Sequence, residues 1–289
     1  MKYLLLPFLV LLVLSGFALK YSKGNKVSII NQQARAKLIN PEGRTVGTRI
    51  SVPEGFERIK TESGLLRYFR NLQVKPFKAP VLLFNGNLKN RQDVHAAIIN
   101  MEIGKKDLQQ CADAVMRLRA EYLFKQKNYA AIHFNFTSGD KAAYTKYAEG
   151  YRPVFNRNKV IWLKKAAVNY TYSVFRNYMD LVFSYAGTAS LEKELIAVSG
   201  LKNIKPGDVL IRGGFPGHAV MVIDVALNSK TGEIIYLLSQ SYMPAQEIHI
   251  LKNPNNRKLS PWYSAASSDN INTPEWTFSA SQLKRFSTW

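Results

Sequence analysis

The chain contains one cysteine and four histidines, and this set limits the chemistry that its side chains can perform. A single cysteine, Cys111, excludes an intrachain disulfide and any Cys-x-x-Cys metal or redox site. The sequence also lacks a serine-hydrolase elbow, a phosphate-binding loop, a dinucleotide-binding glycine motif and a His-Glu-x-x-His zinc motif. The histidines are too widely spaced for a local metal site, so we expect neither a metal nor another cofactor. The chemistry that remains is that of a cysteine with a histidine.

Cys111 is predicted near the start of a helix. The residues from 107 onward, DLQQCADAVMRLRAEYLFKQ, carry apolar side chains at helical spacing, and Asp107 is a candidate N-cap. The positive end of a helix dipole favours an anion, so a thiol placed there is expected to have a lowered pKa and to supply a nucleophilic thiolate. Cys111 also lies on the apolar stripe of its helix, which leaves packing in the core as the alternative interpretation.

His218 is the candidate base, because it follows the GGFPG loop and opens the apolar strand AVMVIDVA. A structural role for this histidine is the alternative. A hairpin of residues 219–226 and 233–240 that turns near Lys230 would place Gln240 opposite Val220, on the face of the sheet that carries His218. The side-chain oxygen of Gln240 would then accept the ring N–H and orient the imidazole. A shift of one residue would present Ser239 or Ser241 instead.

The elements around these residues predict an α+β fold. Helices are expected at 61–73, 107–126 and 171–199, the last as one or two helices, and strands at 80–85, 95–103 and 130–136. The C-terminal third is different, because the short apolar runs 208–213, 219–226 and 233–240 follow one another with turn residues between them. Helices followed by consecutive antiparallel strands are typical of the α+β class.

The first residues of the chain are typical of an export signal. Residues 3–19 are apolar, Lys2 precedes them and Lys20 follows, and their length is at the short limit for a membrane anchor. We therefore expect residues 1–19 to be an export signal or anchor, residues 20–50 a basic linker, and residues 51–289 a single α+β domain. The protein is expected to be periplasmic, or anchored to the membrane facing the periplasm. An exposed unpaired thiol is a liability in an oxidising compartment, so the presence of Cys111 there would be explained either by burial or by a catalytic role.

The charge of the chain is strongly positive and spread along its length. It has 40 Lys and Arg against 20 Asp and Glu, a formal net charge of +20. No nucleic-acid-binding motif accompanies this charge, so nucleic acid is not an expected partner. Cell-wall peptide or another polyanionic polymer of the envelope fits an exported basic protein better.

Several strings in the sequence resemble known families. The run GDVLIRGGFPGHAVMVID resembles the strand, glycine loop and histidine strand of NlpC-like and related papain-like cysteine hydrolases. The strings DLQQCADAVMRLRAEYL, YAGTASLEKEL, QSYMPAQEIHIL and TPEW are similar to a bacterial family of domain of unknown function, 4846, over about residues 50–289. The second resemblance covers most of the chain and brings no activity with it.

The papain-like resemblance implies a helical part that carries the cysteine, followed by an antiparallel sheet that carries the histidine. Matched by position, Cys111 would be the nucleophile, His218 the base and Gln240 the orienting residue. The chain departs from the NlpC-like pattern at the nucleophile, where QQCAD stands in place of an Asp-Cys-Ser-Gly type of string. The donor to the oxyanion is therefore open, with the backbone N–H of Cys111 as the natural candidate and Gln109 or Gln110 as others.

These observations favour an exported cysteine hydrolase that cleaves an amide bond through an acyl-enzyme, with cell-wall peptide as the expected substrate. The alternative is a non-catalytic protein that binds envelope polymer on the same scaffold. Acyl transfer by the same Cys111 and His218 pair is a third hypothesis, which differs from hydrolysis only in the acceptor.

Overall fold

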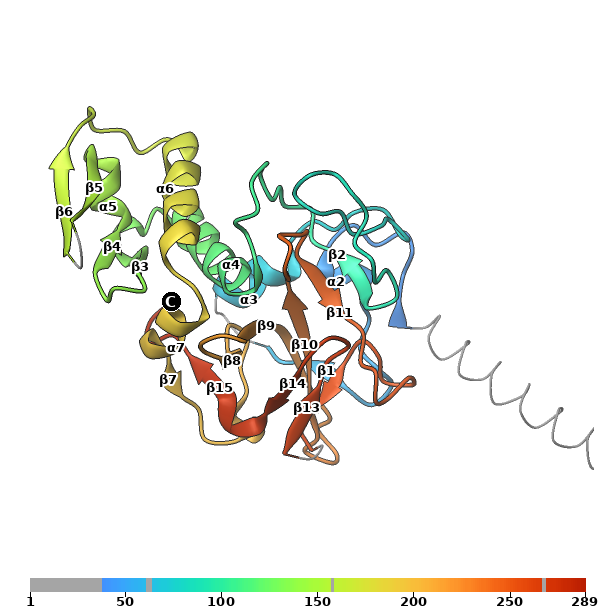
Figure 1. The fold of residues 1–289 in the computed structure, drawn as a ribbon. Helices are drawn as coiled ribbons and strands as arrows, with labels where there is room; N and C mark the ends of the chain where they lie inside the picture. Colours follow the sequence, from blue (N-terminus) through green and yellow to red (C-terminus); the bar gives the residue numbers. More distant parts are fainter. Residues whose placement is uncertain (1–37, 61–63, 157–158, 267–268) are drawn as a thin grey trace, which may run out of the picture.

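The computed structural model describes residues 38–60, 64–156, 159–266 and 269–289. The expected export signal at residues 1–19 lies outside these residues, as does the expected linker up to residue 37. Within the described residues, no helix combines the length and the apolar character that crossing a membrane requires. Helices and antiparallel strands are mixed along the chain, which is the α+β class predicted from the sequence (Figure 1).

The helices of the described residues are mostly short, and α4 is the longest of them. The α-helices are α2 (Val46–Arg49), α3 (Gly64–Arg70), α4 (Cys111–Lys125), α5 (Tyr144–Ala148), α6 (Tyr172–Tyr185) and α7 (Thr188–Glu194). The described part of the chain also contains the 3-10 turns η1 (Tyr129–Ala131), η2 (Leu201–Asn203) and η3 (Ala280–Gln282). The helices expected at 107–126 and 171–199 are therefore present, the second as the pair α6 and α7.

Among the described residues, nine strands form one antiparallel sheet. Its main path runs in the order β2 (His95–Ile98), β11 (His249–Leu251), β10 (Ile234–Gln240), β9 (His218–Leu227), β8 (Val209–Arg212), β15 (Leu283–Arg285) and β7 (Ile196–Ala197). Two further short strands join it, β1 (Glu57–Arg58) on β9 and β12 (Tyr263–Ser264) on β10. The remaining strands form three hairpins: β3 (His133–Asn135) with β4 (Lys141–Ala143), β5 (Tyr151–Asn156) with β6 (Lys159–Lys164), and β13 (Asn270–Asn272) with β14 (Thr277–Ser279).

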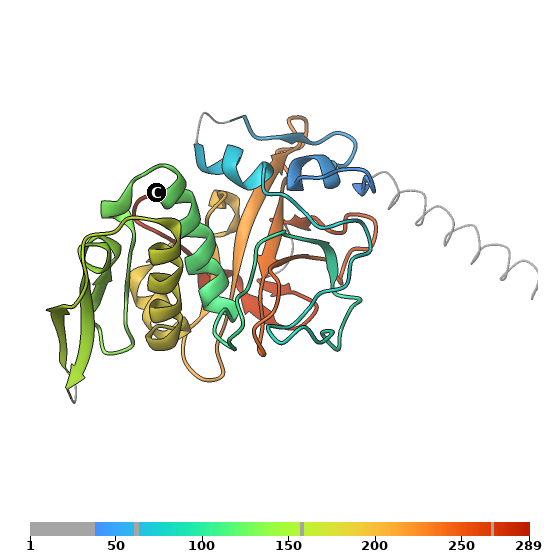
Figure 2. The ribbon, with the colours of Figure 1, turned by 90° about the horizontal axis from the view of Figure 1, so that it is seen from above.

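Both faces of the central strand β9 are buried. Ala219 and Met221 belong to the core on the side of α4, whereas Val220 and Val222 belong to a second core together with Phe278 of β14. A strand covered on both faces has no polar face, which explains why residues 219–223 are all apolar. In Figure 2, α4 lies beside the two long strands and α6 lies on its outer side.

The hairpin of β9 and β10 has the register expected from the sequence. Ser239 pairs with Met221, which brings Gln240 beside Val220 at the end of β9 that begins with His218. The turn is closed by Asn228, whose side-chain oxygen accepts hydrogen bonds from the backbone N–H groups of Lys230 and Thr231. An irregularity between Leu237 and Leu238 shifts the register by one residue further along the hairpin.

Three expectations about local structure were wrong. Residues 80–85 form no strand, because Leu82 and Leu83 make only isolated bridges within a loop. Asp107 does not cap α4, because its carboxylate accepts the backbone N–H of Ala245 at 2.6 Å, and the N-cap is Gln110. Residues 38–50 do not belong to a linker.

Those thirteen residues, 38–50, are part of the folded structure instead. Leu38, Val46 and Ile50 are buried, and Val46 and Ile50 belong to the larger core. Thr45 caps the short helix α2 through a capping box with Thr48. The segment looks like a linker in the sequence because it is basic and because its three buried apolar residues are spaced too irregularly to show a helix or strand period.

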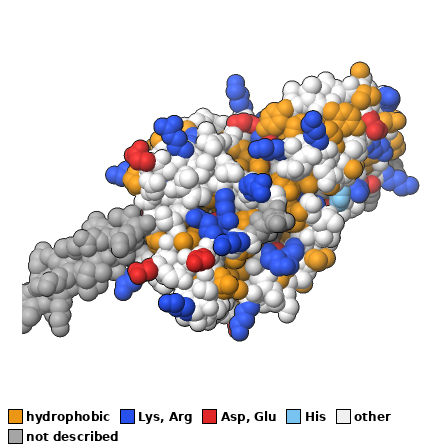
Figure 3. All heavy atoms as spheres, turned by 180° about the vertical axis from the view of Figure 1, so that it is seen from behind, with side chains coloured by type: hydrophobic (Ala, Val, Ile, Leu, Met, Phe, Trp, Pro, Cys, Tyr) orange, Lys and Arg blue, Asp and Glu red, His pale blue; other side chains and the backbone are white. Residues whose placement is uncertain are grey.

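A long excursion separates α4 from β8. It holds the hairpins β3–β4 and β5–β6 with the helices α5 to α7, and it extends to the upper left in Figure 1. The excess of positive charge is spread over the surface, and Figure 3 shows Lys and Arg scattered over one face with fewer Asp and Glu among them.

Candidate active site

Cys111 and His218 line the same small cavity. Its volume is about 140 Å³, and its walls are Cys111, the loop residues Phe215 to Gly217, His218, Tyr242, Met243 and Trp276. The residues come from the start of α4, the start of β9, the segment after β10 and the turn before β14. The fold therefore brings the predicted nucleophile and base together although 107 residues separate them (218 − 111) in the chain.

Cys111 is the first residue of α4. The helix begins after Gln110, whose backbone N–H donates to the Asp113 carboxylate at 3.0 Å. The N-terminal end of α4 packs against the beginning of β9, and the thiol lies near the backbone N–H groups of Ala112 and Ala219 as well as its own. The expected position in the first turn of a helix is thus what the structure has.

The pKa of the thiol differs from the expectation. Burial, with a smaller contribution from the charge of Asp113, raises the pKa of the Cys111 thiol to about 11. The backbone N–H groups around the sulfur act in the opposite direction and are outweighed. The helix terminus does favour an anion, but the loss of solvent costs more, so Cys111 is a neutral thiol in this cavity.

His218 is held by Gln240. The side-chain oxygen of Gln240 lies 3.0 Å from His218 Nε2, and both side chains are almost completely buried. The second ring nitrogen, Nδ1, has no hydrogen bond with any described residue. It is not completely enclosed by protein atoms either. Nδ1 is therefore the ring nitrogen that is available to a partner, on a side chain that lines the cavity together with the thiol, although the thiol does not hydrogen-bond to it in this structure.

The surroundings of His218 keep its ring neutral. Burial lowers the pKa of His218 to about 4, against the hydrogen bond to Gln240, which acts to raise it. Three rings enclose the imidazole, those of Tyr242, Trp276 and Phe278, with centroids 4.8, 5.4 and 5.7 Å away. A neutral imidazole with a free ring nitrogen is a base, so the site holds an acid and a base in their uncharged forms.

The mouth of the cavity is apolar and exposed. Phe215, at the tip of the GGFPG loop, is 96% exposed, and Met243 is 52% exposed. Gly217 brings the loop close to its neighbours, because a Cβ atom there would lie 2.5 Å from the carbonyl oxygen of Gly214 and 2.5 Å from Thr188 Oγ1. The glycine at this position is thus what allows the loop to pass this close to Thr188 and to its own backbone.

Neither glutamine before the cysteine contacts the cavity. Gln109 accepts a hydrogen bond from Arg117 at 3.0 Å, and Gln110 donates to Asp107 at 3.1 Å. The backbone N–H groups at the start of α4 are the donors that remain for an oxyanion. Among the described residues, no group of three or more His, Cys, Asp or Glu side chains is placed to hold a metal ion.

Two parts of the site were missed in the sequence. The ring of Trp276 lies against the imidazole at a tilt of 43°, and the adjacent Glu275 accepts a hydrogen bond from Gln240 at 2.7 Å. Both lie in the string TPEW, within a turn that has no helix or strand period. The only available signal was the string itself, since an acidic and an aromatic residue are adjacent there without a pattern to explain them.

Comparisons with known proteins identify one family. The family described as a domain of unknown function (4846) matches residues 46–285. No curated protein and no solved structure matches the chain. The matched region includes Cys111, His218 and Gln240, and it begins at Val46, the first residue of α2.

Proposed function

The chain belongs to the family of domain of unknown function 4846, and we propose that it is an exported cysteine hydrolase that cleaves an amide bond in cell-wall peptide. The observation that carries the proposal is the shared cavity. It is lined by one thiol and by one imidazole whose Nδ1 has no hydrogen-bond partner among the described residues, while Nε2 is held by Gln240. This is the arrangement that acyl transfer by a cysteine requires.

The order of the elements supports a papain-like arrangement. The helix α4 carries the cysteine at its N-terminus, and the later antiparallel strands β9 and β10 carry His218 and Gln240. A resemblance to NlpC-like hydrolases in the strand, loop and histidine around residue 218 points in the same direction. The long segment between α4 and β8 would be an insertion into a minimal arrangement of this kind.

The chemistry begins from an uncharged pair. As the sulfur of Cys111 bonds to the amide carbon, its proton passes to Nδ1 of His218, and backbone N–H groups at the start of α4 stabilise the oxyanion. His218 then gives this proton to the leaving nitrogen, the C–N bond breaks, and a thioester remains. A water then gives a proton to Nδ1 as its oxygen bonds to the thioester carbon. The C–S bond breaks, the protonated Nδ1 returns this proton to the sulfur, and the carboxylic acid product leaves with the thiol and the neutral ring restored. Distances between catalytic groups are often long before substrate binds, which fits the missing hydrogen bond between thiol and ring.

The cavity and its surroundings suggest the kind of substrate. A volume of about 140 Å³ accommodates a small side chain, and the exposed Phe215 and Met243 offer apolar contacts to the residues beside it. The net charge of +20 favours a negatively charged polymer as the carrier of the scissile bond. Short peptides attached to an envelope polymer combine these properties.

The test uses the full chain with purified cell-wall peptide fragments and measures newly released amino groups. We expect Cys111→Ala and His218→Ala to lose at least about 10³-fold in rate, since each removes a group that the acyl-transfer steps need. His133→Ala is the matched control, because His133 is a half-buried histidine on β3 that does not line the cavity. Equal release by the wild-type protein and by Cys111→Ala would refute the proposal.

A second candidate function, binding of envelope polymer without catalysis, is favoured by a different cavity. This cavity has a volume of about 730 Å³, shares no residue with the first, and is lined by Arg49, Lys78 and Lys252 among apolar residues such as Phe77. None of the described residues that line it is acidic. Sedimentation with purified cell-wall sacculi separates the candidates: a binding protein loses affinity in Lys78→Gln and keeps it in Cys111→Ala.

A further inference from the structure

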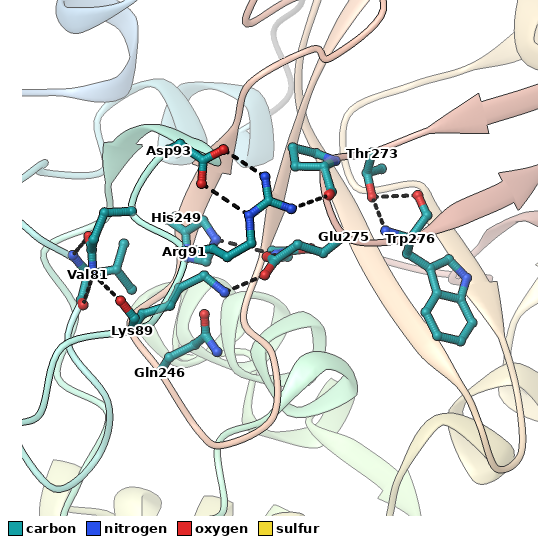
Figure 4. A network of polar contacts seen from close by, with 12 residues as sticks. Val81, Lys89, Arg91, Asp93, Gln246, His249, Thr273, Glu275 and Trp276 are labelled. Carbon is teal, nitrogen blue, oxygen red and sulfur yellow. Dashed lines mark hydrogen bonds and ion pairs between the residues drawn. The ribbon is translucent and has the colours of Figure 1, made fainter.

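A buried polar network lies behind the candidate base. The amide of Gln240 is at its centre, with Oε1 3.0 Å from His218 Nε2, and with Nε2 2.7 Å from Glu275 Oε2 and 3.4 Å from His249 Nε2. The other oxygen of Glu275, Oε1, lies 2.5 Å from the Lys89 ammonium group. Figure 4 shows Lys89, His249 and Glu275 converging from the loop before β2, the start of β11 and the turn between β13 and β14.

The two groups that face the amide nitrogen of Gln240 are both acceptors. His249 Nδ1 lies 2.8 Å from the carbonyl oxygen of Glu247, and because a carbonyl can only accept, Nδ1 carries the hydrogen. Burial lowers the pKa of His249 to about 3, so the ring is neutral and its Nε2 presents a lone pair. Glu275 is a carboxylate paired with the buried Lys89, which is only 6% exposed, and a carboxylate can only accept.

We propose that Glu275 and His249 are positioning residues, which fix the orientation of the Gln240 amide and through it the tautomer of His218. With both hydrogens of the amide nitrogen directed at acceptors, the amide oxygen is the atom that faces His218. His218 Nε2 must then donate, so the hydrogen of the neutral ring is on Nε2 and the lone pair is on Nδ1. This inference rests on the proposed function, because it explains how Nδ1 is kept free to take the proton of Cys111.

The opposite orientation shows what the network prevents. If the amide of Gln240 were turned over, its oxygen would face the Glu275 carboxylate and its NH₂ group would face His218 Nε2. The ring would then accept at Nε2 and carry its hydrogen on Nδ1, the ring nitrogen that is available to a partner. A protonated Nδ1 cannot act as a base toward the thiol. Turning over the Gln240 amide would therefore inactivate the site without moving a backbone atom.

The direct test is a nitrogen NMR spectrum of the full chain with ¹⁵N-labelled histidine at neutral pH. The chain has four histidines, and the signals of residue 218 are assigned by their absence in His218→Gln. We expect His218 to carry its hydrogen on Nε2 and His249 to carry its hydrogen on Nδ1. A wild-type His218 with its hydrogen on Nδ1 would overturn the proposal without any variant.

Two variants then test the role of Glu275. In Glu275→Gln, the new amide turns its oxygen to the Lys89 ammonium group and its NH₂ group to Gln240. The contact of Gln240 Nε2 with residue 275 is shorter than its contact with His249 Nε2, 2.7 Å against 3.4 Å, so we expect the Gln240 amide to turn over. We expect the hydrogen of His218 to move predominantly to Nδ1. In Glu275→Gln combined with Lys89→Met the ammonium group is absent, the new amide oxygen can face Gln240 again, and the tautomer should return to Nε2–H.

Asp93→Asn is the matched control, because Asp93 is an exposed acid that pairs with Arg91 beside the network and does not contact Gln240. An unchanged His218 tautomer in Glu275→Gln, or no return in the double variant, would refute the role of Glu275. The spectrum needs no substrate, so its result does not depend on the hydrolase proposal. Where hydrolysis is measured, kcat should fall in Glu275→Gln and recover in the double variant, whereas activity that survives Cys111→Ala would refute the hydrolase alone.

Discussion

The raised pKa of the buried thiol predicts a slow and steadily pH-dependent reaction of Cys111 with iodoacetamide. Only the thiolate reacts, and burial raises the pKa of Cys111 to about 11. At pH 7 a thiol of that pKa is ionised to ~10⁻⁴, whereas an ordinary thiol of pKa ~8.5 is ionised to ~3 × 10⁻². The folded protein should therefore react about 300-fold more slowly at pH 7 than the same chain unfolded in urea.

The assay follows incorporation of the label by mass spectrometry between pH 6 and pH 10. Because Cys111 is the only cysteine in the chain, every labelled molecule reports on the site, and the unfolded chain is a reference of identical sequence. The rate for the folded protein should rise about tenfold per pH unit without a plateau in this range. Trp276→Ala should open the cavity to water and bring the rate closer to that of the unfolded chain.

A plateau below pH 8 for the folded protein would refute this reasoning. It would mean that the thiolate exists at neutral pH, as an ion pair with a protonated imidazole, and that burial does not determine the charge state of the site. The same plateau, if abolished in His218→Ala, would assign the ion pair to His218. The neutral pair described above predicts instead that the proton leaves the sulfur only as the substrate is attacked.

Three further predictions concern the stability of the fold and the closure of the cavity. Burial lowers the pKa of His218 to about 4, so the stability that the neutral ring contributes is present above pH ~6.5 and is lost as the pH falls. Between pH 6.5 and 5, urea titrations should show that the wild-type protein loses about 1.5 kcal/mol more unfolding free energy than His218→Gln. Asp224→Asn should lower the unfolding free energy by about 3 kcal/mol in the same measurement, because this fully buried carboxylate pairs with two arginines at 2.6 and 2.8 Å. A decrease of less than about 1 kcal/mol would mean that these ion pairs do not stabilise the fold as buried pairs. Gly217→Ala should displace the loop and speed labelling of the thiol, since its Cβ would lie 2.5 Å from two neighbouring oxygen atoms, whereas Gly187→Ala has open space and should not.

The sequence predicts the part of the site that lies within one hairpin. Turn residues at 228–232 and two apolar runs determine the register of β9 and β10, and this register places Gln240 beside His218. The start of α4 was expected within a few residues of its position, because the apolar spacing after Cys111 is helical. These are local patterns, in which chain neighbours determine the structure.

The parts that the sequence does not predict depend on contacts between distant segments. The sequence favours Asp107 as a helix cap, but its carboxylate instead accepts a hydrogen bond from the backbone N–H of Ala245, which lies 138 residues away (245 − 107). Glu275 joins the site through a turn, and its partner Lys89 lies in a loop whose residues 80–85 looked like a strand. The thiol pKa depends on how completely the cavity excludes water, which no local pattern reports.

The distance along the chain between the parts of the site has a consequence during synthesis. Cys111 leaves the ribosome 164 residues before Glu275 (275 − 111), and the hairpin that covers the thiol is made in between. Until β9 and β10 pack against α4, the thiol is exposed and has the ordinary pKa of about 8.5. A chain that meets an oxidising compartment before that point can be captured there as a mixed disulfide. Such an adduct would mark molecules whose folding is unfinished, because the finished fold buries the only sulfur atom that could form it.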